Sequence, residues 1–407
     1  RASRYCRTLR PPSASNHAQP TRNACVPAPP LKPVVSRSKN TNGGTARAPA
    51  HSSGAAWAEA SRRSASAPIV ARLPRGGNGP PAFTFAIEAD PHLDVRSDPS
   101  IFGEVIDSIV ATSPAFLIDL GDTLMVDTLT QPTISNIRDR ASRFRQYFDR
   151  LGDAIPLHMV IGNHDGEAGW APSLARLSND VRREAFPASV HARNYRAFTH
   201  GDALFVLLDP FGSTTVKPNA DPWAWTLGRE QYEWLARTLE ASTETWRFVF
   251  IHHLVGGDRL GRGGVEVARR FEWGGCDPDG SLAFAARRPG WGVPIHDLFV
   301  DWGVTAVFKG HDHLYAHQEL DGITYQTLPQ PSHPGESVRQ AAEYGYVTGT
   351  VRGGSGFLSV TVEATVTTVR FVKWNPRTGM AVDASYELFA RVVNAQAGRL
   401  AQPEAPS

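Results

Sequence analysis

The sequence predicts an α/β fold made of two packed mixed β-sheets flanked by helices. Three observations support this prediction: short, almost wholly apolar runs recur between residues 82 and 308, helix-like stretches separate most of them, and short strands with few helices follow residue 313. Strands that are apolar throughout are buried on both faces, as in sheets covered by helices. A second sheet packed on the first is the simplest way to close such a core.

The predicted elements follow in chain order. Apolar, β-prone runs predict strands at residues 82–87, 115–120, 156–161, 203–208, 247–251 and 304–308. Helical patterns lie between them at 101–110, 134–148 and 229–240. After residue 313 the predicted strands are 323–328, 347–351, 357–362 and 367–372. There is no internal repeat.

Charge divides the chain into two unequal parts. Residues 1–80 hold thirteen Lys or Arg against one acid, Glu59, so they carry +12 and leave −10 for the remainder of a chain whose net charge is +2. Residues 1–80 are also rich in Ser, Pro and Ala, and we expect a disordered basic extension because such a composition buries little apolar surface. The acidic remainder is a poor candidate for nucleic-acid binding, which needs a basic face, so we expect no nucleic-acid partner.

Membrane, targeting and cysteine signals are weak. No run of about 18 apolar residues is present, so we expect no membrane span, and we find no clear secretion signal. Only three cysteines occur, Cys6, Cys25 and Cys276, which disfavours a disulfide framework or a thiolate metal site. The compartment and the oligomeric state stay open.

Side chains of metal-ligand type follow five of the predicted strands where each strand ends. These clusters are Asp90-Pro-His92, Gly121-Asp122, Gly162-Asn163-His164-Asp165, His252-His253 and Gly310-His311-Asp312-His313. Ligands bind beyond the carboxyl ends of the strands in α/β sheets, so we expect the clusters to converge. Each glycine precedes a ligand candidate, where it permits unusual backbone angles and a close approach of the chain.

Each cluster also has a purely structural interpretation. An isolated Asp-Pro-His is usually a turn and Gly-Asp carries little information, whereas two imidazoles flanking an acid would not suit an apolar core. The five clusters together, in this order, favour metal binding. Their mixture of carboxylate, amide oxygen and imidazole suits Mn, Fe or Zn, whereas an all-oxygen set would suggest Mg or Ca.

This order of motifs, from residue 83 to about 318, resembles the calcineurin-like metallophosphoesterase superfamily, which includes purple acid phosphatases and phosphodiesterases. The resemblance implies a metallophosphoesterase β-sandwich and a dinuclear centre of two divalent or trivalent transition-metal ions. It assigns the ligands of one metal to Asp90, His92 and His313. It assigns those of the other to Asn163, His252 and His311, with Asp122 bridging the two.

The resemblance also implies catalytic groups outside the metals. His164 would lie near the phosphate and the leaving group, and Asp165 would orient its ring. One position departs from purple acid phosphatases, which place a Tyr three residues after the bridging Asp. Here that position is Met125, so we expect no tyrosinate absorption band and have less reason to assume Fe(III).

The expected function is hydrolysis of phosphodiesters or phosphomonoesters by metal-activated hydroxide, with a small-molecule phosphate ester as the partner. The absent Tyr and a long insertion favour a diesterase or a broad-specificity enzyme. Two alternatives stay open: a nucleotide pyrophosphatase-type hydrolase, and a catalytically silent scaffold that keeps the fold.

The predicted catalytic domain covers residues 81–392, with a disordered tail at 393–407. Its segment 256–293 is long for a strand connection and rich in Gly, Arg and aromatic residues. We interpret it as a lid whose Arg259, Arg262 or Trp273 contacts substrate, although a solvated loop with its aromatic residues packed on the body is equally consistent. His253 is either a substrate or supporting group, or incidental.

Overall fold

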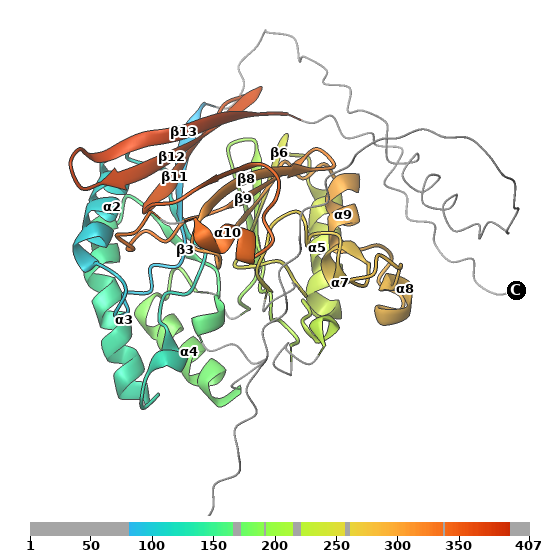
Figure 1. Ribbon diagram of the computed structural model, residues 1–407, viewed down its shortest axis with the longest axis horizontal. Coiled ribbons are helices and arrows are strands. Elements are labelled where there is room, and N and C mark those ends of the chain that lie inside the picture. The colour runs from blue at the N-terminus through green and yellow to red at the C-terminus, as the bar shows by residue number, and fades with distance from the viewer. Residues whose placement is uncertain are drawn as a thin grey trace, which may run out of the picture. The chain divides into compact units, whose positions relative to one another are not determined.

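The computed structural model describes residues 81–165, 172–190, 193–214, 221–256, 261–336 and 338–390. Two mixed β-sheets form the centre of this part (Figure 1). The six-stranded sheet has the order β13-β12-β11-β1-β2-β3. Its strands are β1 (Phe83–Glu88), β2 (Leu117–Asp119), β3 (Leu157–Met159), β11 (Gly356–Val362), β12 (Val366–Asn375) and β13 (Gly379–Phe389).

The second sheet has seven strands in the order β10-β8-β9-β7-β6-β5-β4. They are β4 (Arg196–His200), β5 (Ala203–Leu207), β6 (Trp246–Ile251), β7 (Ala306–Lys309), β8 (Tyr315–Leu320), β9 (Ile323–Thr327) and β10 (Thr350–Arg352). Strands β1, β2 and β3 are parallel, and so are β5, β6 and β7. The carboxyl ends of both parallel sets therefore carry the loops that form the site.

Aromatic side chains fill the space between the two sheets. Phe85 of β1 packs edge-to-face on Phe205 of β5, with ring centroids 5.1 Å apart. Phe248 and Phe250 of β6 belong to the same buried cluster. Burying aromatic rings of this size is a main source of stability for the sandwich, and it explains why these strands are apolar on successive residues.

Helices cover the outer face of each sheet (Figure 1). The six-stranded sheet is covered by α2 (Pro99–Ala111), α3 (Ile134–Phe148) and α4 (Pro172–Ala185). The seven-stranded sheet is covered by α5 (Arg229–Ala241), α7 (Phe271–Gly274) and α9 (Ile295–Asp301). Asp98 and Thr133 accept hydrogen bonds from backbone N–H groups in the first turns of α2 and α3, which fixes where these helices begin.

The predicted fold of two packed mixed sheets flanked by helices is confirmed. The elements that were not predicted include α4, the short helices α7, α8 (Phe284–Arg287) and α10 (Arg339–Glu343), and the strands β4, β8 and β13. Of β13, only Leu388 is buried, so an edge strand of this kind carries little hydrophobic signal. The expectations for residues 1–80 and 393–407 lie outside the described residues. No helix in the described ranges has the length and apolar character needed to cross a bilayer.

Candidate metal centre

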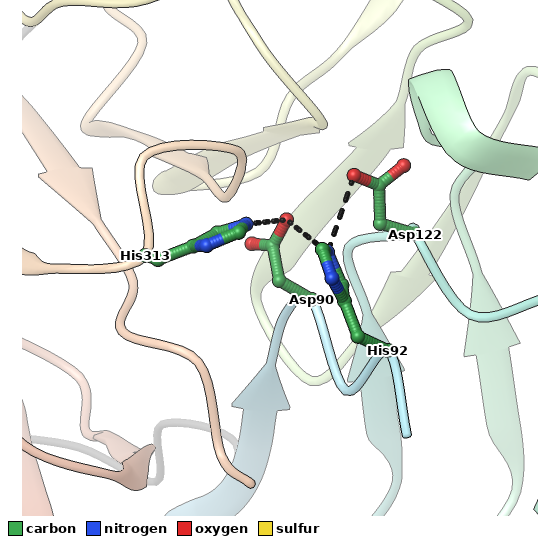
Figure 2. Close-up of side chains that lie close together, drawn as sticks. All are labelled: Asp90, His92, Asp122 and His313. Atoms are coloured by element: carbon green, nitrogen blue, oxygen red, sulfur yellow. Dashed lines mark ion pairs between the residues drawn. The ribbon is translucent and has the colours of Figure 1, made fainter. Parts of the chain in front are cut away.

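Four side chains from the ends of β1, β2 and β7 converge on one point. Asp90 and His92 follow β1, Asp122 follows β2 and His313 follows β7. Asp90 Oδ1 lies 3.4 Å from His313 Nε2 and 3.7 Å from His92 Nε2, and His92 Nε2 lies 3.5 Å from Asp122 Oδ2. Figure 2 shows the four side chains directed toward one another, and one ligand atom from each lies within 4.8 Å of all the others.

A second cluster lies beside the first and shares Asp122 with it. His252 Nε2 lies 3.2 Å from Asp122 Oδ2, 3.0 Å from Asn163 Oδ1 and 3.2 Å from His311 Nδ1. The other ring nitrogen of His252 hydrogen-bonds the carbonyl oxygen of Leu120 at 2.8 Å, so Nδ1 carries a proton and Nε2 is the atom that faces the cluster. Acceptor atoms therefore surround a point where only a proton or a cation is stable.

Each aspartate uses one carboxylate oxygen to hold a loop and turns the other toward the site. Asp90 Oδ2 accepts the backbone N–H of His311 at 2.8 Å, and Asp122 Oδ1 accepts that of His164 at 2.7 Å. The remaining oxygens, Asp90 Oδ1 and Asp122 Oδ2, are those that face the histidine rings. The ligand loops are thus tied to one another, which fixes the geometry without using the oxygens that a metal would need.

Five of the ten non-glycine residues with positive φ in the described ranges are ligand candidates. Asp90, His92, Asp122, His311 and His313 all have positive φ, between 52° and 73°. Residues other than glycine rarely adopt this region, and each costs of order 1–3 kcal/mol when the surroundings hold it there. Strain concentrated on five ligand candidates favours a functional role for the loops.

Two of the three glycines that precede ligand candidates are explained by close approach rather than by backbone angle. A Cβ atom on Gly162 would lie 2.2 Å from the backbone nitrogen of Asp122, and one on Gly310 would lie 2.5 Å from Asp90 Oδ2. Of the three glycines that precede ligands, only Gly121 has a positive φ, at 94°. The expectation of unusual backbone angles therefore holds at Gly121 alone, while Gly162 and Gly310 leave room for the carboxylates.

Unsatisfied polar atoms show that the residues fit a bound cation. Asp90 Oδ1, His92 Nε2 and Asp122 Oδ2 are buried and have no hydrogen-bond partner within the described ranges. A buried polar atom without a partner is costly, and a metal ion would satisfy all three. The set of carboxylate oxygens, an amide oxygen and imidazole nitrogens suits a transition metal.

The pKa values of the histidines also show that the carboxylates of the site favour positive charge. Burial alone would lower the pKa of His252, but the carboxylates of Asp122 and Asp90 raise it to about 9. Burial would likewise lower the pKa of His92, which Asp122, Asp90 and Asp94 instead hold well above its usual range. Burial keeps the pKa of His311 well below its ordinary value, with the charge of Arg262 adding to the effect. Metal binding therefore competes with protons at two of the histidines.

His164 lies at the rim of the centre, with its side chain 27% exposed. Its Nδ1 hydrogen-bonds Asp127, at 2.8 Å from Oδ1 and 3.0 Å from Oδ2. Burial lowers the pKa of His164, but Asp122 and Asp127 outweigh this and raise it. Asp127 is not among the residues predicted from the sequence, because an acid in the loop after Gly121-Asp122 has no distinguishing pattern.

Asp165 has a different role from the expected one. Its carboxylate is fully buried and accepts the backbone N–H groups of Gly162, Asp122 and Leu124 at 2.7–3.0 Å. These bonds join the loops after β2 and β3, and Asp127 instead of Asp165 bonds the ring of His164. Asp165 therefore fixes the backbone that carries two ligand candidates, which is a correction to the predicted orienting role.

The four residues predicted to contact substrate lie in different surroundings. Arg262 lies beside the centre, with Nη1 hydrogen-bonded to the carbonyl oxygen of His311. His253 is buried against Trp225 and its Nδ1 hydrogen-bonds the carbonyl oxygen of Leu254. Trp273 is completely buried and donates its indole N–H to the hydroxyl of Tyr325, so the structure places it in the core. Arg259 lies outside the described residues.

The described part of the 256–293 insertion packs on the body of the protein. Phe271 and Phe284, from α7 and α8 (Phe284–Arg287), form a small buried cluster with Trp223. Glu272 is buried, accepts the backbone N–H of Leu227 and pairs with Arg288 at 2.5 Å. Of the two interpretations of the insertion, these contacts favour aromatic residues packed on the body.

Comparisons with known proteins agree with this geometry. The family model for calcineurin-like phosphoesterases matches residues 83–315, whereas a search of curated proteins finds no match. The solved structure of PhoD is similar over 78% of this chain and 72% of its own, with 14% identity and a TM-score of 0.55. The purple acid phosphatase PPD1 from yellow lupin (Lupinus luteus) is similar over 77% of this chain and 55% of its own, with 14% identity and a TM-score of 0.51.

At this level of identity, the two solved structures show a shared fold and nothing more specific. The family match covers more than half of the chain and includes the residues of both clusters. The expected resemblance is therefore confirmed, and this chain belongs to the calcineurin-like phosphoesterase family.

Proposed function

We propose that this protein is a dinuclear metal-dependent phosphoesterase that hydrolyses phosphodiesters or phosphomonoesters. The observation that supports the proposal is the pair of ligand clusters joined by Asp122. Asp90, His92 and His313 would hold one metal ion and Asn163, His252 and His311 the other, with Mn, Fe or Zn as the candidate metals. Two such ions, when bound, neutralise the charge of the phosphoryl group and supply hydroxide at neutral pH.

His164 would protonate the oxygen of the leaving group. Asp127 occupies Nδ1, so Nε2 is the nitrogen that remains for the substrate. The carboxylates of Asp122 and Asp127 raise the pKa of the ring and so keep a proton available for donation. A cationic imidazole in this position also stabilises negative charge that develops on the departing oxygen.

Arg262 would bind phosphoryl oxygens that do not react. Its guanidinium lies next to the loop that carries His311 and His313, and its side chain is 23% exposed. Arginine presents a planar set of donors that matches phosphate geometry, so a partly exposed guanidinium at the edge of the centre suits an anionic ester. His253, by contrast, is buried and packed, and we propose a supporting role for it against His311, whose ring centroid is 5.0 Å away.

The proposal is tested by comparing two substrates on one protein. The full chain would be stripped of metal, reloaded with Mn, Zn or Fe, and assayed with bis-p-nitrophenyl phosphate and p-nitrophenyl phosphate. We expect metal-dependent cleavage of at least one ester, and the ratio of the two kcat/KM values gives the diester or monoester preference. Cleavage of a nucleotide pyrophosphate alone would support an anhydride hydrolase, and no cleavage with any metal would support a scaffold.

A further inference from the structure

The aspartate between the two histidines of Gly-His-Asp-His collects donors from three separate segments. Asp312 is 2% exposed, and its Oδ2 accepts Lys309 Nζ at 2.7 Å, the hydroxyl of Tyr346 at 2.5 Å and the backbone N–H of Gly263 at 3.0 Å. Lys309 ends β7, Gly263 belongs to the insertion, and Tyr346 follows α10 (Arg339–Glu343). The carboxylate therefore ties these segments to the loop that carries two ligand candidates.

Arg262 is the residue that this arrangement holds in place. Its Nη1 bonds the carbonyl oxygen of His311 and lies 3.5 Å from Asp312 Oδ1. Its guanidinium carbon lies 4.6 Å from the ring centroid of Tyr344, so the side chain is fixed between the ligand loop and an aromatic face. Nε and Nη2 have no hydrogen-bond partner among the residues that the structure describes, which leaves donors for an anion.

Tyr344, Tyr346 and Arg262 are connected to one another through Asp312. Tyr344 and Tyr346 come from the same turn after α10, and Gly263 is the residue next to Arg262. Asp312 thus holds the two segments that flank the guanidinium. It bonds the backbone of the insertion directly at Gly263, and it bonds Tyr346, which fixes the turn that carries Tyr344. A buried ion pair such as Lys309–Asp312 adds little net stability compared with apolar packing, so stability alone does not account for this network.

We propose that Asp312 is a positioning residue that, through Tyr346 and Gly263, holds Arg262 at the edge of the metal centre to receive phosphate oxygens. The inference rests on the proposed function and extends it to residues with no ligand role. It predicts that a change at Tyr346, whose hydroxyl bonds Asp312 and Thr327 and no ligand candidate, weakens phosphate binding because Arg262 becomes less well ordered.

The test is a double-mutant cycle on the full, Mn-loaded protein with inorganic phosphate as the probe. Dissociation constants for phosphate would be measured by calorimetry for wild type, Tyr346→Phe, Arg262→Met and the double variant. We expect Arg262→Met to weaken phosphate binding by about 10- to 100-fold, as for loss of a charged hydrogen-bond donor. Tyr346→Phe should weaken it by about 3- to 10-fold in the wild-type background, and by less than about twofold in the Arg262→Met background.

Two further measurements separate positioning from a general structural role. Mn affinity, measured by equilibrium dialysis, should change by less than about twofold in Tyr346→Phe, since the hydroxyl bonds Asp312 and Thr327 and no ligand atom. Tyr386→Phe is the matched control, because it removes a tyrosine hydroxyl bonded to Gln326 on the opposite sheet, and it should leave phosphate affinity unchanged.

Each result decides the proposal. Equal losses from Tyr346→Phe in both backgrounds, a parallel loss of Mn affinity, or no phosphate binding by the Mn-loaded wild type would overturn the positioning role. The expected coupling in a protein that hydrolyses neither ester would support the positioning role and overturn the proposed phosphoesterase function.

Discussion

The Nδ1 atom of His164 lies 2.8 Å from Oδ1 of Asp127, five residues after Asp122 in the chain. The backbone N–H of His164 donates to Asp122 at 2.7 Å, so the ring and the main chain of one residue are held by two acids of the same loop. The loop after β2 therefore supplies both a metal-ligand candidate and the partner of the proposed proton donor. This relationship makes the roles of Asp127 and Asp165 separable by experiment.

Asp127→Asn should lower kcat and leave metal content unchanged. The amide keeps the shape of the side chain but removes the charge that raises the pKa of His164, so the ring loses its proton at lower pH. We expect a loss of about 10-fold in kcat, as for supporting carboxylates elsewhere, and an alkaline limb of the pH–rate profile that moves to lower pH. An unchanged profile would exclude Asp127 from the proton transfer.

Asp165→Asn should instead reduce metal content, because Asp165 fixes the backbone of Gly162 and Asp122.

His164→Ala should keep both metals and lose activity. The side chain is at the rim and supplies no ligand atom to either cluster. Loss of a general acid costs roughly 10²- to 10⁴-fold in rate. The loss should be smaller for bis-p-nitrophenyl phosphate, whose leaving group needs less protonation, than for an alkyl ester. Similar rates for wild type and variant with an alkyl ester would remove His164 from the mechanism.

Asp122→Asn should weaken both metal sites together. Asp122 Oδ2 lies 3.5 Å from His92 Nε2 in one cluster and 3.2 Å from His252 Nε2 in the other. Metal-to-protein ratios after gel filtration, measured by mass spectrometry, should fall toward zero for the variant and stay at the wild-type value for Asp149→Asn, a surface control whose side chain is 61% exposed. Loss of one metal with retention of the other would show that Asp122 does not bridge.

Metal binding should stabilise the protein more strongly as the pH rises. In the metal-free protein the pKa of His252 is about 9, raised above that of the unfolded chain. Protonated His252 therefore stabilises the metal-free fold fully below about pH 6.5, and this contribution disappears as the pH rises through about 9. A metal must displace the same proton, so the increase in Tm on adding Mn should be larger at pH 8.5 than at pH 6.5. A pH-independent increase would mean that no histidine proton is displaced.

The convergence of the ligand candidates could be predicted in part from sequence, because strand ends and motif chemistry agree. Asp90 and Asp122 follow neighbouring parallel strands of one sheet, whose carboxyl ends meet at one edge, so their convergence needs no knowledge of loop geometry. His311 follows β7 of the other sheet, so its approach to Asp90 depends on how the two sheets pack. The partners of these residues could not be predicted. Asp127 and Tyr346 reach the site through segments between the main helices and strands, whose course depends on packing, and acids and tyrosines occur in many loops. Lys309 ends β7, and no sequence pattern marks it as a partner of Asp312.

The 256–293 insertion is a region whose structure could not be predicted from its composition. Its composition is equally consistent with a lid that contacts substrate and with a solvated loop whose aromatic residues pack on the body. The structure shows that one arginine near its end is used internally, because Arg288 pairs with buried Glu272 and also hydrogen-bonds the carbonyl oxygen of Trp223. Composition alone does not show whether an aromatic residue faces solvent or core, since both environments accept Trp.

Trp273→Phe should therefore affect stability rather than catalysis. Trp273 is completely buried, packs edge-to-face on Phe299 with ring centroids 5.5 Å apart, and donates to the hydroxyl of Tyr325 at 3.0 Å. Tyr325 also hydrogen-bonds His296, so the indole N–H belongs to a buried polar network. Loss of the donor should lower the free energy of unfolding by about 1–3 kcal/mol, measured by denaturant titration. KM for either nitrophenyl ester should stay at the wild-type value, because the indole is buried in the core and its N–H is used by Tyr325. A raised KM with unchanged stability would restore Trp273 as a substrate contact and would require the insertion to open during turnover.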